Sequence, residues 1–149
     1  MKIILNDLQE TQEVAKKLGQ MIKPPFVLFL KGSLGTGKTN FTQSLAKGLD
    51  VKTHVNSPTF VLMKIYEGEL RLVHVDAYRL EGIDEPIGVQ DECNDESVLV
   101  VEWPEFLNEK IIPDMILTFE ILDQNTRSCL IETEHPIGLK WRNYVATRN

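Results

Sequence analysis

The chain of 149 residues is poor in the residues that build disulfide scaffolds and metal clusters, with two cysteines and three histidines. Cys93 and Cys129 lie far apart and have no metal-binding spacing, so we expect free thiols in a reducing compartment. No apolar run is long enough to cross a membrane, and the apolar stretch at the N-terminus is too short for a signal peptide. These absences predict a soluble, cytoplasmic protein with no membrane association.

Positive charge is also scarce, since 16 Lys and Arg stand against 22 Asp and Glu and the net charge is −6. A surface that binds nucleic acid on its own needs a basic stripe, and the basic residues here are scattered. Lys140, Arg142 and Arg148 come nearest to a patch, and a solvated terminal helix accounts for them equally well. The hydrophobic share of 42% allows a normal core, and the length predicts one domain over residues 1–149.

What the chain does contain is a glycine-rich segment, GSLGTGKT, at residues 32–39. It fits G-x-x-x-x-G-K-[ST], the phosphate-binding loop, or P-loop (Walker A motif), of nucleotide-binding proteins. The apolar run at residues 26–30 predicts a buried strand before the loop. Phe41, Leu45 and Leu49, spaced four apart, predict a helix after it that ends near Gly48. Strand, glycine-rich turn and helix start form the context that this motif requires.

The residue types of the loop suit ATP and magnesium. Glycines let backbone N–H groups converge on phosphate oxygens, and the start of a helix adds partial positive charge. The Lys38 ammonium group can reach the outer phosphates, and the Thr39 hydroxyl can bind Mg²⁺. The loop residues predicted to contact the nucleotide are Ser33, Leu34, Gly35, Thr36, Gly37, Lys38 and Thr39.

The remaining pattern predicts an α/β fold of the P-loop NTPase type. We expect a mixed sheet with parallel core strands, added antiparallel hairpin strands and flanking helices. Strands are expected at residues 3–5, 59–66, 70–76, 98–101, 116–122 and 128–133, a helix from Asp7 to Pro24 and another at residues 137–147, with short helices and loops in the acidic segment after residue 76. The residues expected to be buried in these two helices are Leu8, Val14, Leu18, Met21 and Ile22 in the first, and Leu139, Tyr144 and Val145 in the second.

Two carboxylates follow apolar strands, Asp76 after LVHV and Glu102 after VLVV. A P-loop enzyme needs a carboxylate on the magnesium side, and such a group stands at the end of a strand near the loop. One of the two could serve the metal and the other the attacking water. Either could instead simply cap the end of its strand. His74 lies two residues before Asp76 and would share its face of a regular strand, but has no metal-ligand spacing.

The segment NSPTF, residues 56–60, is the other polar stretch of interest. Pro58 stiffens it, and its hydroxyl groups could face the outermost phosphate as switch loops do. From the residues alone, a plain connecting loop is the better interpretation.

Taken together, GSLGTGKT, NSPTF, HVDAYRL and VEWPE, in this order and spacing, resemble the small bacterial TsaE family, formerly known as YjeE proteins. The likeness spans nearly the whole chain. It implies an ATPase that is required for making threonylcarbamoyladenosine in tRNA and that hydrolyses ATP slowly. It also implies association with the TsaB and TsaD proteins, of which TsaD modifies adenosine 37, so that tRNA is met only through the complex.

The resemblance also assigns roles to residues of this chain. Lys38 would grip the phosphates, and Thr39 and Glu102 would bind magnesium. Asp76 would be the residue most needed for hydrolysis, which makes Lys38, Asp76 and Glu102 the expected catalytic set. Thr11 would lie near the adenine.

The chain departs from the family pattern in places. Ser33 and Thr36 replace Asp and Ala of the usual GDLGAGKT, at variable positions of the loop motif. HVDAYRL stands where HFDLYRL is usual, and the acidic segment after it matches weakly. Trp103, in VEWPE, would sit beside the nucleotide pocket or the partner surface.

Two alternatives are left open by the residues. A small P-loop kinase for a nucleoside or metabolite needs several arginines over the phosphates, and here only Arg71, Arg79 and Arg127 precede the last helix. A GTPase is less favoured because no N-K-x-D segment is present. The second alternative is a non-hydrolysing switch that binds nucleotide only in order to dock a partner.

Overall fold

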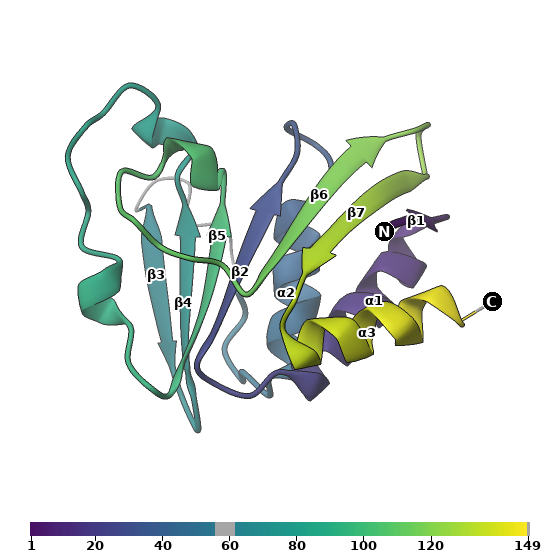
Figure 1. Ribbon diagram of the computed structural model, residues 1–149, viewed down its shortest axis with the longest axis horizontal. Helices are drawn as coiled ribbons and strands as arrows, with labels where there is room; N and C mark the ends of the chain where they lie inside the picture. The colour runs from purple at the N-terminus through teal and green to yellow at the C-terminus, as the bar shows by residue number, and fades with distance from the viewer. Residues whose placement is uncertain (56–61, 149) are drawn as a thin grey trace.

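The structure is a computed structural model that describes residues 1–55 and 62–148 (Figure 1). These residues form one seven-stranded sheet, three α-helices and three short 3-10 helices. In chain order the elements are β1 (Lys2–Leu5), α1 (Leu8–Met21), β2 (Phe26–Lys31), α2 (Lys38–Gly48), β3 (Met63–Glu67), β4 (Arg71–Asp76), η1 (Tyr78–Leu80), η2 (Gln90–Glu92), β5 (Ser97–Glu102), η3 (Pro104–Phe106), β6 (Met115–Ile121), β7 (Arg127–Thr133) and α3 (Pro136–Ala146).

The sheet is mixed, with the order β1-β7-β6-β2-β5-β4-β3 (Figure 1). β2 pairs in parallel with both β5 and β6, and β5 pairs in parallel with β4. The hairpin partner β3 runs antiparallel at one edge, while β7 and β1 complete the other edge in antiparallel pairs. This arrangement confirms the predicted parallel core with added hairpin strands. Because β2, β4 and β5 run parallel, their C-terminal ends lie at the same end of the sheet.

Each face of the sheet carries its own apolar cluster, because successive side chains of a strand point to opposite sides. The larger cluster joins all three α-helices to the sheet, as shown by Leu18 of α1, Phe41 of α2 and Trp141 of α3. The second cluster includes Val75 of β4 and Val101 of β5, on the opposite side. It is covered by the long connections that follow β4 and β5. No helix in the described part of the chain combines the length and apolarity needed to cross a membrane.

Two expected anchors were wrong. Leu8 is 53% exposed, although Val14 and Leu18 of the same predicted stripe are fully buried. Tyr144 of α3 is exposed as well. The buried anchors of that helix are Val145, as predicted, and Trp141, whose indole N–H donates to the Val14 carbonyl at 2.8 Å. Periodicity identifies a stripe along a helix, but not how far the neighbouring element extends beneath it.

Helices α1 and α2 cross at unusually close range through two glycines. A Cβ atom on Gly19 would lie 2.2 Å from the Leu45 carbonyl oxygen, and one on Gly48 would lie 2.1 Å from the Lys16 carbonyl oxygen. Backbones can approach this closely only where no side chain stands between them. The crossing holds the helix that follows the phosphate loop against the first helix of the chain.

Candidate nucleotide and magnesium site

The glycine-rich segment forms the turn that its sequence predicts, between the end of β2 and the start of α2. Gly32, Gly35 and Gly37 all have positive φ angles, of 138°, 81° and 99°. Such angles are strained for residues with a side chain. At Gly32 a Cβ atom would also lie 2.7 Å from the Phe119 carbonyl oxygen. The strand, turn and helix expected around residues 32–39 are therefore confirmed, and the loop fits phosphate oxygens by the chemistry of its N–H groups.

A cavity of about 380 Å³ opens above this turn. Its lining comes from three places in the sequence: the loop with the first turn of α2, the residues around the end of β4, and the end of β5. The lining residues are Leu34, Gly35, Thr36, Gly37, Lys38, Thr39, Asn40, Asp76, Tyr78, Glu102 and Trp103. The fold thus brings residues 34–39 of the predicted loop and both predicted carboxylates together around one cavity, whereas the predicted Ser33 is not part of its lining.

Lys38 is only 5% exposed, and its side chain folds back over the loop. Its ammonium group donates to the carbonyl oxygens of Gly32 at 2.6 Å and Ser33 at 2.9 Å. Ser33 is therefore linked to the cavity only through the carbonyl oxygen that Lys38 contacts. Burial lowers the Lys38 pKa, while the negative charges of Glu102 and Asp76 oppose that shift. These contacts hold the Lys38 ammonium group at the floor of the cavity.

Asp76 and Glu102 end neighbouring parallel strands and are register partners across β4 and β5. Glu102 is 3% exposed, and its Oε1 accepts a hydrogen bond from the Thr39 hydroxyl at 3.5 Å. Its Oε2 lies 2.7 Å from Nε2 of the fully buried His74. β5, which carries Glu102, is the direct neighbour of β2, and β4 lies one strand further out. Glu102 is thus the carboxylate closer to the loop threonine.

The environment of Asp76 works against its negative charge. Burial raises the Asp76 pKa, and the nearby Glu102 carboxylate adds to the rise. A hydrogen bond from the Tyr78 N–H to Oδ1, at 3.1 Å, partly opposes it. A carboxylate whose pKa is raised is a better proton acceptor than an ordinary one, which is the property that a general base needs.

The Thr39 hydroxyl and the Glu102 carboxylate are hard oxygen donors next to the phosphate loop, and this donor set fits Mg²⁺. Within the described residues, no three His, Cys, Asp or Glu side chains gather as a metal cluster. A Mg²⁺ ion that arrives with a nucleotide does not require one, because it keeps several waters and takes further oxygen ligands from the phosphates.

The cavity also has an aromatic wall. The rings of Trp103 and Phe106 are stacked 5.5 Å apart and 3° from parallel, and the Tyr78 ring lies 5.1 Å from that of Trp103. Trp103 has a left-handed backbone with φ 57°, and the Lys38 ammonium lies 4.7 Å from its ring centroid. Tyr78 and Asn40 were not predicted as site residues. The only hint in the sequence was their position, because each lies within two residues of a predicted site residue.

Some of the predicted residues lie elsewhere. Thr11 does not line the cavity; it is buried in α1, where its hydroxyl donates to the Asp7 carbonyl at 3.2 Å. The hydroxyl groups of residues 56–60 fall outside the residues that the structure describes.

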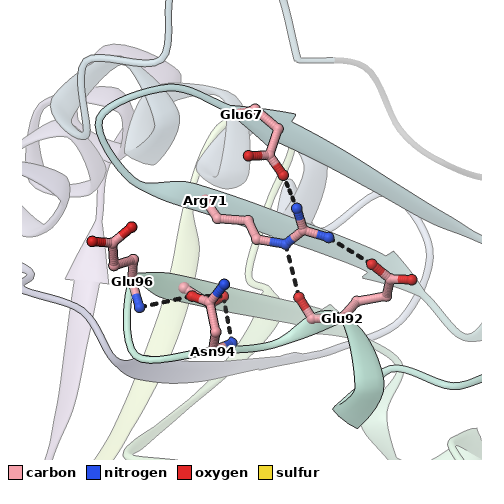
Figure 2. Close-up of polar contacts among 6 residues, drawn as sticks. Glu67, Arg71, Glu92, Asn94 and Glu96 are labelled. Carbon is pink, nitrogen blue, oxygen red and sulfur yellow. Dashed lines mark hydrogen bonds and ion pairs between the residues drawn. The ribbon is translucent and has the colours of Figure 1, made fainter.

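One of the three arginines considered for a kinase lies away from the phosphate loop. Arg71 stands at the start of β4, whereas the site is at the end of that strand. Figure 2 shows its guanidinium group between the carboxylates of Glu67 and Glu92. Arg127 does contact the loop, since its Nη2 donates to the Gly35 carbonyl at 3.4 Å.

Comparisons with known proteins agree with the motifs. The family described as "Threonylcarbamoyl adenosine biosynthesis protein TsaE" matches residues 5–130. Two proteins named tRNA threonylcarbamoyladenosine biosynthesis protein TsaE are similar to the chain. The one from Bacillus subtilis (strain 168) is 41% identical over 104 residues, which make up 69% of this chain and 66% of that protein. The one from Aquifex aeolicus (strain VF5) is 40% identical over 133 residues, or 87% of this chain and 94% of that protein.

The fold is matched by a solved structure. The crystal structure of Bacillus subtilis YdiB superposes with a TM-score of 0.77 at 26% identity, covering 99% of this chain and 95% of that one. The family match and the relatives confirm the resemblance first drawn from the motifs. The chain therefore belongs to the TsaE family of threonylcarbamoyladenosine biosynthesis proteins.

Proposed function

We propose that the chain is a magnesium-dependent ATPase that serves the synthesis of threonylcarbamoyladenosine in tRNA by acting on a TsaB–TsaD complex. The observation that carries the proposal is a single cavity in which Lys38 and Thr39 of a phosphate loop face Asp76 and Glu102. The names of the relatives support the pathway. The partner proteins follow from the family resemblance.

Lys38 supplies the positive charge for the outer phosphates. In the structure its ammonium donates to two loop carbonyls, and a phosphate oxygen is a stronger acceptor than either. Bound Mg²⁺ would neutralise developing negative charge on the phosphate oxygens. Thr39 and Glu102 are the residues that would hold it, because their oxygens lie together beside the loop.

Asp76 is the general base of the proposal. It lines the cavity while Glu102 stands against the loop threonine, so it is available to orient a water molecule and accept its proton. Its raised pKa suits that role. The rings of Tyr78 and Trp103, 5.1 Å apart, line the same cavity as these groups.

The kinase alternative is weakened by Arg71, whose charge is used by Glu67 and Glu92 at the other end of β4. The alternative of a non-hydrolysing docking switch uses the same cavity and differs only in turnover. Slow hydrolysis is useful mainly to a partner, so the rate with the partner present decides between the two.

The proposal is tested by measuring ATP affinity by calorimetry, with and without Mg²⁺, and ATP turnover, with and without TsaB–TsaD. Lys38→Ala should weaken ATP binding about 10- to 100-fold, because hydrogen bonds to charged groups contribute about 1.5–3 kcal/mol. Glu102→Ala should remove the Mg²⁺-dependent part of the affinity. Asp76→Ala should keep ATP binding and lower turnover about 10²-fold or more.

Lys47→Ala is the matched control, since Lys47 is an exposed lysine of the same helix and should leave binding unchanged. Unchanged ATP affinity in Lys38→Ala would refute the site. If Asp76→Ala lost Mg²⁺-dependent binding while Glu102→Ala lost only turnover, the two roles would be exchanged. Wild-type turnover in both carboxylate variants would make the nucleotide a docking ligand only.

A further inference from the structure

His74 is a fully buried side chain of β4 that the proposed mechanism does not use. It lies two residues before Asp76 on the same strand, and directly opposite Val100 of β5 in the register. The strand alternation therefore turns it to the same face as Asp76 and Glu102. It is not among the residues that line the cavity. Whatever His74 does at the site, it does through another residue.

That other residue is Glu102. The His74 Nε2 atom lies 2.7 Å from Glu102 Oε2, a short distance for a hydrogen bond between a nitrogen and an oxygen. The other carboxylate oxygen, Oε1, accepts from the Thr39 hydroxyl. The two oxygens of Glu102 thus have different partners. One is held by a buried ring behind the site, and the other faces the loop residue that would share the metal.

The direction of the His74 bond follows from the partners. An ionised carboxylate can only accept, so Nε2 must carry the hydrogen. In the neutral imidazole, Nδ1 is then a lone-pair acceptor, and it is buried with no hydrogen-bond partner among the described residues. An apolar side chain would fill this place without leaving a buried nitrogen unpaired. The contribution that distinguishes the imidazole is therefore its bond to Glu102.

We propose that His74 is a positioning residue that locks the Glu102 carboxylate in the orientation that binds Mg²⁺. This inference rests on the proposed function, since it assigns a role toward the same magnesium. Glu102 is nearly fully buried, so few waters are available to hold its Oε2 in place of the imidazole. Without that bond the carboxylate could rotate away from Thr39. Outer partners of metal ligands typically change metal affinity or activity about 10- to 100-fold when removed.

The test compares three variants at this position. His74→Leu removes the donor and keeps an apolar side chain in the core. His74→Gln places an amide N–H near the position of Nε2, and His74→Asn carries the same amide on a shorter side chain that falls short of Glu102. The quantity measured is the gain in ATP affinity on adding Mg²⁺, by calorimetry, with circular dichroism to verify folding.

We expect His74→Leu to keep its ATP affinity without Mg²⁺ and to lose about 10- to 100-fold of the Mg²⁺-dependent gain. His74→Gln should restore most of the gain, and His74→Asn should not. In the Glu102→Ala background, His74→Leu should have no further effect, because the group that it positions is gone. Val75→Ala is the matched control. Val75 is buried on the other face of β4, so this substitution weakens packing without changing a contact of Glu102.

The inference is overturned if His74→Leu keeps the full gain, or if all three variants and Val75→Ala lose it alike, which would indicate general packing. If His74→Leu fails to fold, the comparison of His74→Gln with His74→Asn decides, and equal gains in those two reject the inference. If the wild-type chain binds ATP with no Mg²⁺-dependent gain, the proposed magnesium-dependent function is rejected. That result differs from a rejection of the His74 role alone, in which the wild-type chain shows the gain and His74→Leu keeps it.

Discussion

Asp76 is a buried carboxylate whose environment opposes its negative charge, and the general-base role proposed for it requires that charge. Its folded-state pKa is raised by burial and by Glu102, so the protonated form suits the folded protein better than the charged form does. The contribution of the protonated Asp76 side chain to folding stability is fully present below the pKa that Asp76 has in the unfolded chain. That contribution is lost as the pH rises through the pKa that Asp76 has in the folded protein. Wherever Asp76 is ionised in the folded protein, its charge therefore lowers the free energy of unfolding.

We predict that Asp76→Asn is more stable than the wild-type chain at pH 7 and nearly inactive as an ATPase. The amide removes the charge but keeps an oxygen for the Tyr78 N–H. The midpoint of thermal unfolding should rise by a few degrees, since each kcal/mol is about 2–4 °C for a chain of this size. The difference should shrink as the pH falls through the folded-state pKa of Asp76. Thermal unfolding without nucleotide, from pH 4 to pH 8, measures it.

Asp95→Asn serves as the control, because Asp95 is an exposed acidic residue far from the cavity lining. It should give no gain that depends on pH in this way. A less stable Asp76→Asn variant at pH 7, or a gain that is constant over the whole range, would contradict the electrostatic explanation.

Among single residues, the sequence predicted the site residues that have a fixed place in a motif or at the end of a strand. Lys38 and Thr39 belong to the phosphate loop, and Asp76 and Glu102 follow apolar strands. His74 was noted on the face of Asp76, but its bond to Glu102 depends on the register between β4 and β5, which no local pattern contains. Thr11 came from the resemblance alone, and the structure does not bring it to the cavity.

Among the elements, the close crossing of α1 and α2 ties the phosphate loop to the first helix of the chain. α2 begins at Lys38, so any displacement of this helix moves the loop as well. The crossing depends on Gly19 and Gly48, where the backbone of one helix meets the carbonyls of the other. A side chain at either position would force the helices apart.

We predict that Gly19→Ala and Gly48→Ala each destabilise the chain by about 1–3 kcal/mol, the usual range for overpacking a tight contact. Both should weaken ATP binding, since α2 cannot move without the loop. Denaturant unfolding and calorimetry are the measurements. Gly68→Ala is the control, because the nearest atom to its added Cβ is 3.8 Å away. If Gly19→Ala were as stable as Gly68→Ala, the close crossing would not matter.

Element types were largely predictable. Alternating and continuous apolar runs predicted the strands. The helix start predicted at Asp7 was also correct, because the Asp7 side chain caps the helix by accepting from the Glu10 N–H at 2.8 Å. The burial of Trp141 was missed, because a 3.6-residue period marks several candidate faces on a short helix. The closeness of α1 and α2 could not be predicted from one sequence, since both glycines also read as ordinary helix breakers.

Over the whole molecule, negative charge is concentrated in one connection. Residues 81–96 hold seven Asp and Glu and no Lys or Arg. This segment is fixed to the sheet near the start of β4, where Arg71 bonds Glu67 and Glu92 and where Asn94 accepts from the Glu96 N–H (Figure 2). An ordered acidic surface repels the phosphates of nucleic acid.

We predict that the isolated chain does not hold tRNA at about 0.15 M salt, where binding relies on neutralised phosphates. Fluorescence anisotropy with labelled tRNA, with and without TsaB–TsaD, is the measurement. Lysine at the exposed positions Asp84, Glu85, Asp91 and Asp95 should produce salt-dependent binding and so prove the assay sensitive. Tight binding by the wild-type chain alone would show that tRNA does not need the complex.

The strand order is what the sequence could not supply. The sequence predicted parallel strands around the loop, but it did not predict that β5 lies between β2 and β4. That insertion places Glu102 next to the loop and Asp76 one strand further away. Pairing between distant segments depends on the whole chain, whereas turns, caps and apolar runs are set locally.

The same strand order governs how the protein is made. β2 pairs with β5 and β6, and both are synthesised after it. Translation at about 5–20 residues per second leaves an interval of roughly 5–20 s between the end of β2 and the end of β6. Until β5 has been synthesised, the apolar β2 segment has no partner strand on either side. The loop at residues 32–39 is therefore made well before the strands that flank β2, and the sheet around it can form only after β5 and β6 have been added.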